Sequence, residues 1–185
     1  MAGSVAGRTV LIQGAAGSIG MCSVQRARLA GANVIGSVRS PDEESIAQQA
    51  GAHQVFRNDK GLSARVKAVA PEGLDHIVEV AFRANINADV ELLKTGGSIA
   101  TYATDHATPG IPYWRLVFKN IRMFFLGSDE FPKGAKISAA RNLNRALETG
   151  CSGSEIAERV PLADIADAHE LVEHPARPGR VVVVI

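Results

Sequence analysis

Residues 9–30, TVLIQGAAGSIGMCSVQRARLA, predict a strand, a glycine-rich turn and a helix in direct succession. Residues 9–12 form a short apolar run rich in β-branched side chains, which is typical of a buried strand. Glycines follow with the spacing G-x-x-G-x-x-G, and Gly20, Val24 and Ala27 then recur on one helical face. This succession indicates the first unit of a nucleotide-binding α/β fold.

The start of the predicted helix is a candidate anion site. Free backbone N–H groups and the positive end of the helix dipole point at whatever lies before the first turn. We expect the main chain of Gly17, Ser18 and Ile19 to hold a pyrophosphate, while Gly20 lets the helix pack against the strand. Ala15 stands where the usual fingerprint G-x-G-x-x-G has its first glycine. The turn alone is therefore also compatible with a glycine-rich connection that binds nothing.

The composition indicates a globular protein without a strongly charged partner. The 185 residues include 20 basic and 19 acidic ones, so the formal net charge is +1. No basic run predicts binding to nucleic acid or to an anionic membrane surface, and no apolar run is long enough to span a bilayer. Residues 1–7 lack the features of a signal peptide, and Cys22 and Cys151 form no C-x-x-C motif. We therefore expect a cytoplasmic protein.

Strands and helices alternate after the glycine turn. Further strands are expected at residues 33–38, 53–56, 75–80, 98–102 and 121–126, and further helices at 41–50, 62–69, 86–93, 112–118 and 135–147. This alternation predicts an α/β protein with a doubly wound parallel sheet, a Rossmann fold of six strands in the order 3-2-1-4-5-6. The helix at 135–147 is expected to turn four apolar residues inward: Ile137, Ala140, Leu143 and Leu147.

The end of the chain departs from this alternation. Residues 156–161 and 181–185 are expected as strands on either side of a helix at 163–173, with a turn at Pro178-Gly179. These two strands have no place in the six-stranded order, so they need another partner. The predicted organisation is a nucleotide-binding Rossmann domain over residues 8–150 and a strand–helix–strand tail over residues 151–185.

The end of the second expected strand bears on which nicotinamide cofactor binds. Proteins of this fold usually place an acid there, about 20 residues beyond the glycines, for the ribose of NAD, or an arginine for the 2′-phosphate of NADP. This chain has Ser37 and Arg39 and no acid at the strand end. Glu43 is assigned instead to an S-x-x-E capping box that begins at Ser40. A phosphate clamp of Arg39 with a serine hydroxyl predicts NADP, and the alternative is a solvated loop arginine.

Several other chemistries of this topology are not encoded. The Tyr-x-x-x-Lys pair of short-chain dehydrogenases is missing, because neither Tyr102 nor Tyr113 is followed by lysine at the fourth position. Met21 stands where a P-loop needs lysine. The histidines show no metal-ligand spacing. Glu79 ends the strand expected at 75–80 and His106 follows the one at 98–102, but both fit solvated or structural roles better. No residue is therefore assigned as catalytic, and no metal site is expected.

Long segments of the chain resemble the cofactor-binding half of zinc-independent medium-chain dehydrogenase/reductases, in particular quinone oxidoreductases of the zeta-crystallin type. The segments are TVLIQGAAGSIG, AGANVIGSV, AGAHQVF, LLKTGGSIATYA, IPYWRLVFKNIRMFFL, VPLADIADAHELVE and GRVVVVI, and together they cover nearly all of residues 8–185. The segment around Ala168-His169-Glu170 is specific to this superfamily. The resemblance implies an NADPH-dependent reductase that transfers hydride to a quinone or an activated enone.

The resemblance also implies a GroES-like catalytic domain that this chain lacks. The small-molecule substrate would be held mainly by that domain, and the strands of the tail would return to it. We therefore expect a fragment with negligible activity of its own. Two alternatives stay open: an enoyl-reductase domain of a polyketide or fatty-acid synthase, and a non-enzymatic NADP-binding sensor module. The apolar strand at 121–126 is a sheet edge in the predicted order, and it is expected to pair two copies into a homodimer.

The resemblance extends the expected cofactor site to the ends of further strands. Main-chain groups there would frame the nicotinamide: Tyr102, Ala103, Thr104, Leu126 and Gly127. The expected cofactor contacts also include Ala16, Asn58 and Ala81. Many quinone reductases have a lysine and a tyrosine near the 2′-phosphate, and those positions are here Glu43 and Asn58. The prediction of NADP therefore depends on Arg39.

Overall fold

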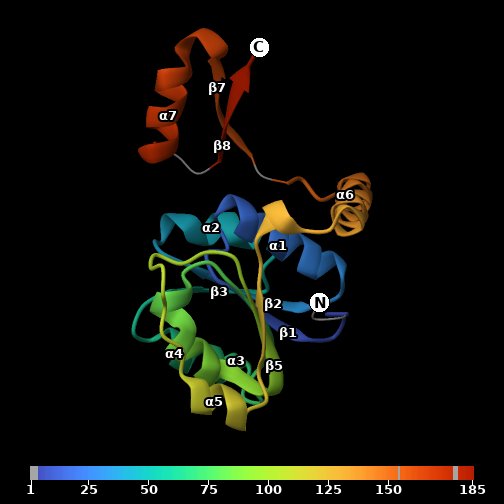
Figure 1. Cartoon of the computed structure of the whole chain (residues 1–185), viewed down its shortest axis with the longest axis vertical. Coiled ribbons are helices and arrows are strands. Elements are labelled where there is room, and N and C mark those ends of the chain that lie inside the picture. Colours follow the sequence, from blue (N-terminus) through green and yellow to red (C-terminus); the bar gives the residue numbers. More distant parts are fainter. Residues whose placement is uncertain (1–3, 154, 177–178) are drawn as a thin grey trace.

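Six parallel strands form one sheet in the order β3-β2-β1-β4-β5-β6. The structure, a computed structural model, describes residues 4–153, 155–176 and 179–185 (Figure 1). The strands of this sheet are β1 Thr9–Ile12, β2 Asn33–Val38, β3 Gln54–Arg57, β4 Leu74–Glu79, β5 Leu93–Thr101 and β6 Arg122–Phe125. The predicted Rossmann fold and its strand order are confirmed.

Helices bury both faces of this sheet. The helices α1 Ser18–Leu29 and α2 Asp42–Gln49 cover one face, and α3 Leu62–Val69, α4 Phe82–Leu92 and α5 Tyr113–Phe118 cover the other (Figure 1). Successive residues of β1 alternate between the two cores: Leu11 packs in the core under α3 and α4, while Val10 and Ile12 pack in the core under α1 and α2. A parallel strand buried on both faces needs a continuous apolar run such as this one.

The boundary between α4 and β5 differs from the prediction. Helix α4 begins at Phe82 rather than at residue 86, and β5 follows it directly at Leu93. Leu93 already pairs with Leu74, and the register then shifts before Ser98 pairs with His76. Gly96, with φ 76°, takes up this irregularity inside the strand, so the glycines do not separate helix from strand. The other predicted elements begin and end within two residues of the observed bounds.

Helix α6, Lys133–Glu148, is more exposed than the prediction of an inward apolar face required. Ile137, Leu143 and Leu147 are 43%, 39% and 47% exposed, and Ala140 is exposed as well. The helix lies beside α1 rather than flat on the sheet (Figure 1), where Arg26 donates to the carbonyl of Asn142 at 2.7 Å. Helical periodicity identifies an apolar face, but it does not say what covers that face, and this prediction was wrong.

The tail forms a second, separate sheet. Strands β7 Ile156–Pro161 and β8 Arg180–Val184 pair in parallel, and helix α7 Ile165–Glu173 connects them. This unit stands apart from the six-stranded sheet in Figure 1. The two tail strands were expected to have no place in that sheet, and they pair with each other instead. Pro178 of the predicted turn lies outside the described residues. Short 3-10 turns cover Ser128–Glu130 and Leu162–Asp164.

No helix in the described parts of the chain is long and apolar enough to cross a membrane.

Candidate nucleotide-binding site

The glycine turn presses the start of α1 onto the end of β1. Gly14 has φ 65°, a left-handed conformation that favours glycine. A Cβ atom on Gly20 would overlap the carbonyl of Gly14, so the helix is in direct contact with the turn. Gly17 precedes the helix in an extended conformation, and among the described residues no side chain caps the helix. The positive end of α1 therefore faces outward at this turn, as an anion site requires.

A cavity of about 510 Å³ lies in front of this helix end, which we call the turn cavity. Seven of the predicted cofactor contacts line it: Gly17, Ser18, Ile19, Arg39, Asn58, Ala81 and Tyr102. Seven further lining residues were not among the predicted contacts: Gln13, Gly14, Gly20, Glu43, Val80, Asn85 and Arg180. The turn cavity thus collects the ends of β1, β2 and β4, which are far apart in sequence. Carboxyl ends of parallel strands meet in this way at the ligand-binding edge of open α/β sheets.

A second cavity, of about 600 Å³, lies at the ends of β5 and β6, and we call it the edge cavity. All five residues predicted to frame the nicotinamide line it: Tyr102, Ala103, Thr104, Leu126 and Gly127. Tyr102 lines both cavities, so the two are neighbours. Phe82 and Phe125, whose rings meet edge to face with centroids 5.8 Å apart, give the edge cavity an apolar wall.

Arg39 reaches the turn cavity, but its charge is shared with Glu43. The guanidinium lies 3.0 Å from the Glu43 carboxylate, and the two side chains are 86% and 16% exposed. The same carboxylate accepts the backbone N–H of Arg39 at 2.8 Å. The predicted capping box from Ser40 is therefore wrong in detail, since Glu43 bonds one residue further back and no described side chain caps α2. An exposed pair four residues apart is worth only about 0.3–0.5 kcal/mol, so a phosphate can compete for this arginine.

Ser37 and Ala16 are not brought to the turn cavity. Ser37 is fully buried, and its hydroxyl donates to the side-chain oxygen of Gln13. Its side chain lies in the protein interior because β2 is an inner strand whose two faces are both covered by helices. The structure therefore leaves no Ser37 hydroxyl available to a 2′-phosphate. Ala16 lines a third cavity, of about 510 Å³, between the glycine turn and the tail, together with Gly17, Ser18 and Arg39.

Arg180 is a candidate phosphate ligand that the sequence analysis missed. It lies at the start of β8, and its side chain lines both the turn cavity and the third cavity. Among the described residues, none of the ion pairs involves Arg180. In the sequence it lies between the turn predicted at Pro178-Gly179 and the apolar strand predicted at residues 181–185. No local signal connects it with a glycine turn at the other end of the chain.

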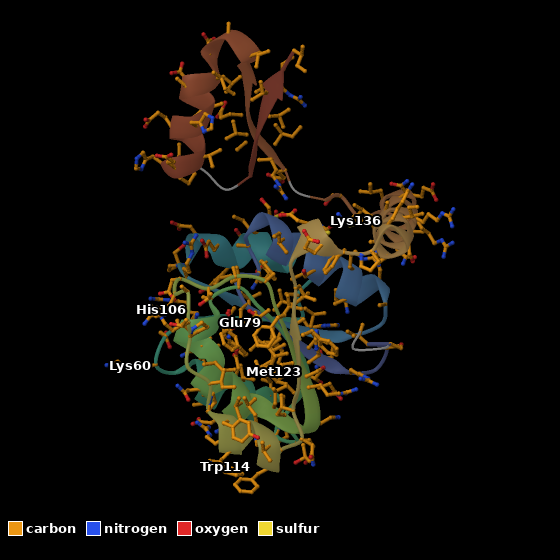
Figure 2. All side chains as sticks on the ribbon, viewed as in Figure 1. Lys60, Glu79, His106, Trp114, Met123 and Lys136 are labelled. Carbon is orange, nitrogen blue, oxygen red and sulfur yellow. The ribbon has the colours of Figure 1, made fainter. Side chains whose placement is uncertain are left out.

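Glu79 and His106 remain without a catalytic assignment. Glu79 is fully buried and accepts hydrogen bonds from Asn85 at 3.1 and 3.2 Å (Figure 2). Burial of Tyr102 and, second, the negative charge of Glu79 raise the pKa of the Tyr102 hydroxyl. His106 lies on an exposed loop and accepts the N–H of Thr108 at 3.2 Å. Among the described residues, no group of three or more His, Cys, Asp or Glu side chains is placed to hold a metal ion.

Comparison with known proteins gives a matching family and several relatives to which this chain is similar. The family described as zinc-binding dehydrogenase matches residues 18–140. The quinone oxidoreductase of Lama guanicoe is 28% identical over 187 residues, which cover 97% of this chain and 55% of that protein. The chain thus spans about half the length of the curated relatives it matches.

Solved structures share the same fold. A mycobacterial quinone oxidoreductase superposes with a TM-score of 0.88 at 23% identity, covering 97% of this chain and 57% of that one. The quinone oxidoreductase of Thermus thermophilus, also described in complex with NADPH, has a TM-score of 0.77 at 25% identity and covers 100% of this chain and 60% of its own.

Proposed function

The chain belongs to the zinc-binding dehydrogenase family, and on that premise we propose that it is the NADPH-binding half of a reductase acting on a quinone or an activated enone. The fold and the matched relatives indicate an oxidoreductase domain for a nicotinamide cofactor. The choice of NADPH and the hydride acceptor are our proposal. The observation that carries it is the turn cavity, where the positive end of α1 and two arginines converge and where the Glu43 carboxylate beside the end of β2 is paired with Arg39.

The residues present fit a dinucleotide in the two neighbouring cavities. A glycine cradle in which a Cβ on Gly20 would clash allows phosphates to approach the backbone. We assign the pyrophosphate to the main chain of Gly17, Ser18 and Ile19, and the 2′-phosphate to Arg39. Arg180 adds a second cation at the same phosphates. Asn58 and Ala81 also line the turn cavity.

The edge cavity suits the nicotinamide ring. When bound, the cofactor supplies the hydride, and the protein contributes binding and orientation. The main chain of Tyr102, Ala103 and Thr104 would hold the ring against Leu126 and Gly127, with Phe82 and Phe125 as an apolar wall. No side chain is assigned to proton transfer. We propose that the substrate is held mainly by the GroES-like domain that the resemblance implies.

The isolated chain is expected to bind NADPH while reducing quinones and enones far more slowly than about 1 per second, a low value for an enzyme. The reason is that the edge cavity supplies a nicotinamide wall but no assigned substrate contact. Loss of NADPH absorbance in the presence of a quinone or an enone measures the rate, and calorimetry on the same sample measures binding. Turnover near 1 per second or above would place the substrate site within this chain.

We also propose that two copies pair through β6. This strand is an edge of the six-stranded sheet, and Phe125 and Leu126 at its end are 68% and 40% exposed. An apolar edge with unpaired backbone groups favours pairing with another chain.

Phe124→Lys is expected to convert this dimer to a monomer, because lysine on an edge strand opposes pairing. Val183→Lys, on β8 of the other sheet, is the matched control and should leave the dimer intact. Light scattering of both variants and the wild-type protein gives the mass in solution. A monomer from Val183→Lys together with a dimer from Phe124→Lys would assign the contact to the tail instead.

A further inference from the structure

A network of buried polar side chains, which we call the polar network, lies directly beneath the turn cavity. Ser37, Gln13, Asp89, Glu79 and Asn85 come from β2, the end of β1, α4 and the end of β4, and each is at most 9% exposed. Figure 2 labels Glu79 within the outline of the six-stranded body, and its side chain is fully buried. Two carboxyl groups within such a buried network are unusual, because a buried charge costs several kcal/mol unless it is compensated.

Hydrogen bonds join the side chains of the polar network, and one of their atoms has no partner. The Ser37 hydroxyl donates to Gln13 Oε1, and Gln13 Nε2 donates to Asp89 Oδ1 at 3.0 Å. On the other side, Asn85 Nδ2 donates to both carboxylate oxygens of Glu79. Asp89 Oδ2 is the buried side-chain atom that has no hydrogen-bond partner among the described residues.

The two carboxyl groups differ in what surrounds them. Glu79 accepts hydrogen bonds from the backbone N–H of Ala81 and from Asn85, and such donors stabilise a negative charge. Asp89 accepts a single bond, from Gln13. Burial and then the neighbouring charge of Glu79 hold the pKa of Asp89 well above its usual range. A proton on Asp89 Oδ2 would complete the hydrogen bonds of the polar network, because Asp89 would then donate to the Glu79 carboxylate instead of repelling it.

We therefore propose that Asp89 is a neutral carboxylic acid that donates its proton to the Glu79 carboxylate and thereby positions Gln13 and Asn85 on the turn cavity. Gln13, Asn85 and Ala81 all line that cavity, so the shared proton connects its β1 wall with its β4 wall. Among the described residues, Tyr102 is a further titratable group that faces Glu79. The positioning of cofactor-contacting groups rests on the proposed function, whereas the shared proton does not.

Asp89→Asn is the variant that separates a donated proton from a buried charge. The amide keeps an oxygen for Gln13 and offers an N–H to Glu79, so it reproduces both bonds of a neutral acid. We expect its NADPH Kd to stay within about twofold of wild type, whereas Asp89→Ala, which removes both bonds, should raise the Kd at least about tenfold, the effect of losing roughly one buried hydrogen bond. Glu79→Gln should weaken binding similarly, because Asn85 Nδ2 donates to both Glu79 oxygens and would therefore face the NH₂ group in either orientation of the amide.

The pH dependence of stability provides a readout that a merely space-filling residue would not change. The pKa of Asp89 is raised from 3.8, so the folded protein keeps a proton that the unfolded chain releases. Stability contributed at this site is therefore lost as the pH rises from the unfolded pKa towards the raised folded pKa. Within that window, the folding equilibrium constant of Asp89→Asn relative to wild type should rise about tenfold per pH unit. Denaturant titrations at several pH values measure this ratio.

Parallel pH profiles for Asp89→Asn and wild type would overturn the shared proton. A tolerated Glu79→Gln with a defective Asp89→Asn would overturn it as well, by placing the proton on Glu79. Unchanged NADPH affinity in folded Asp89→Ala would overturn the positioning role. A wild-type protein that binds neither NADPH nor NADH would contradict the proposed function and the positioning role together, while the pH profiles would still decide where the proton lies.

Discussion

Gly20→Ala is expected to bind NADPH about a hundredfold more weakly than the wild-type protein, the scale of loss that a displaced binding group produces. The added Cβ would overlap the carbonyl of Gly14 and lie 2.9 Å from the Cα of Ala15. Backbone atoms cannot rotate aside as a flexible side chain does, so the start of α1 must move away from the turn. Such overpacking also costs about 1–3 kcal/mol of stability. Calorimetric titration with NADPH and denaturant unfolding measure the two effects.

Gly134→Ala is the matched control for this experiment. Gly134 also lies in the first turn of a helix, α6, but a Cβ added there meets nothing within 4 Å. Alanine favours helix over glycine by up to about 1 kcal/mol, so this variant should be at least as stable as wild type and bind NADPH normally. Wild-type affinity in a folded Gly20→Ala protein would contradict the assignment of the α1 start to the pyrophosphate.

Arg39→Ala is expected to weaken NADPH by up to about 3 kcal/mol, or roughly a hundredfold, and to leave NADH unaffected. In our proposal the guanidinium contacts only the 2′-phosphate, which NADH lacks. Loss of the exposed ion pair with Glu43 should cost little by itself. Titration of both cofactors into the same protein separates selectivity from general affinity. An equal loss for NADPH and NADH would contradict the 2′-phosphate assignment.

Two further variants sharpen the test of Arg39. Arg159→Ala removes an exposed arginine of β7 that lines none of the three cavities, so it controls for the change in net charge. Glu43→Gln removes the carboxylate that holds Arg39, and it should strengthen NADPH relative to NADH by up to about fivefold, the equivalent of about 1 kcal/mol for an exposed pair. Weaker NADPH binding by Glu43→Gln would show that the pair orients Arg39 rather than competing with the phosphate.

The sequence by itself determined the fold and most of the candidate contacts, because their signals are local. The apolar run of β1, the glycine spacing and the face of α1 lie within a single short stretch. The alternation of strands and helices then leaves few topologies for a parallel sheet. Tyr102 and Leu126 were expected from the family resemblance, and both directly follow strands of the sheet. Carboxyl ends of parallel strands always meet at one edge of the sheet.

Only the tertiary structure decided which side chains face that edge. Ser37 has the expected spacing from the glycines, but its side chain is buried and donates to Gln13. The face of α6 that carries Leu143 is exposed. Arg180 reaches the turn cavity from the tail, and Asp89 on α4 meets Glu79 on β4. A linear pattern records the chemistry and spacing of residues, whereas burial and pairing depend on how separate elements pack. Contacts between distant segments, including the shared proton we propose, therefore follow from the folded arrangement alone.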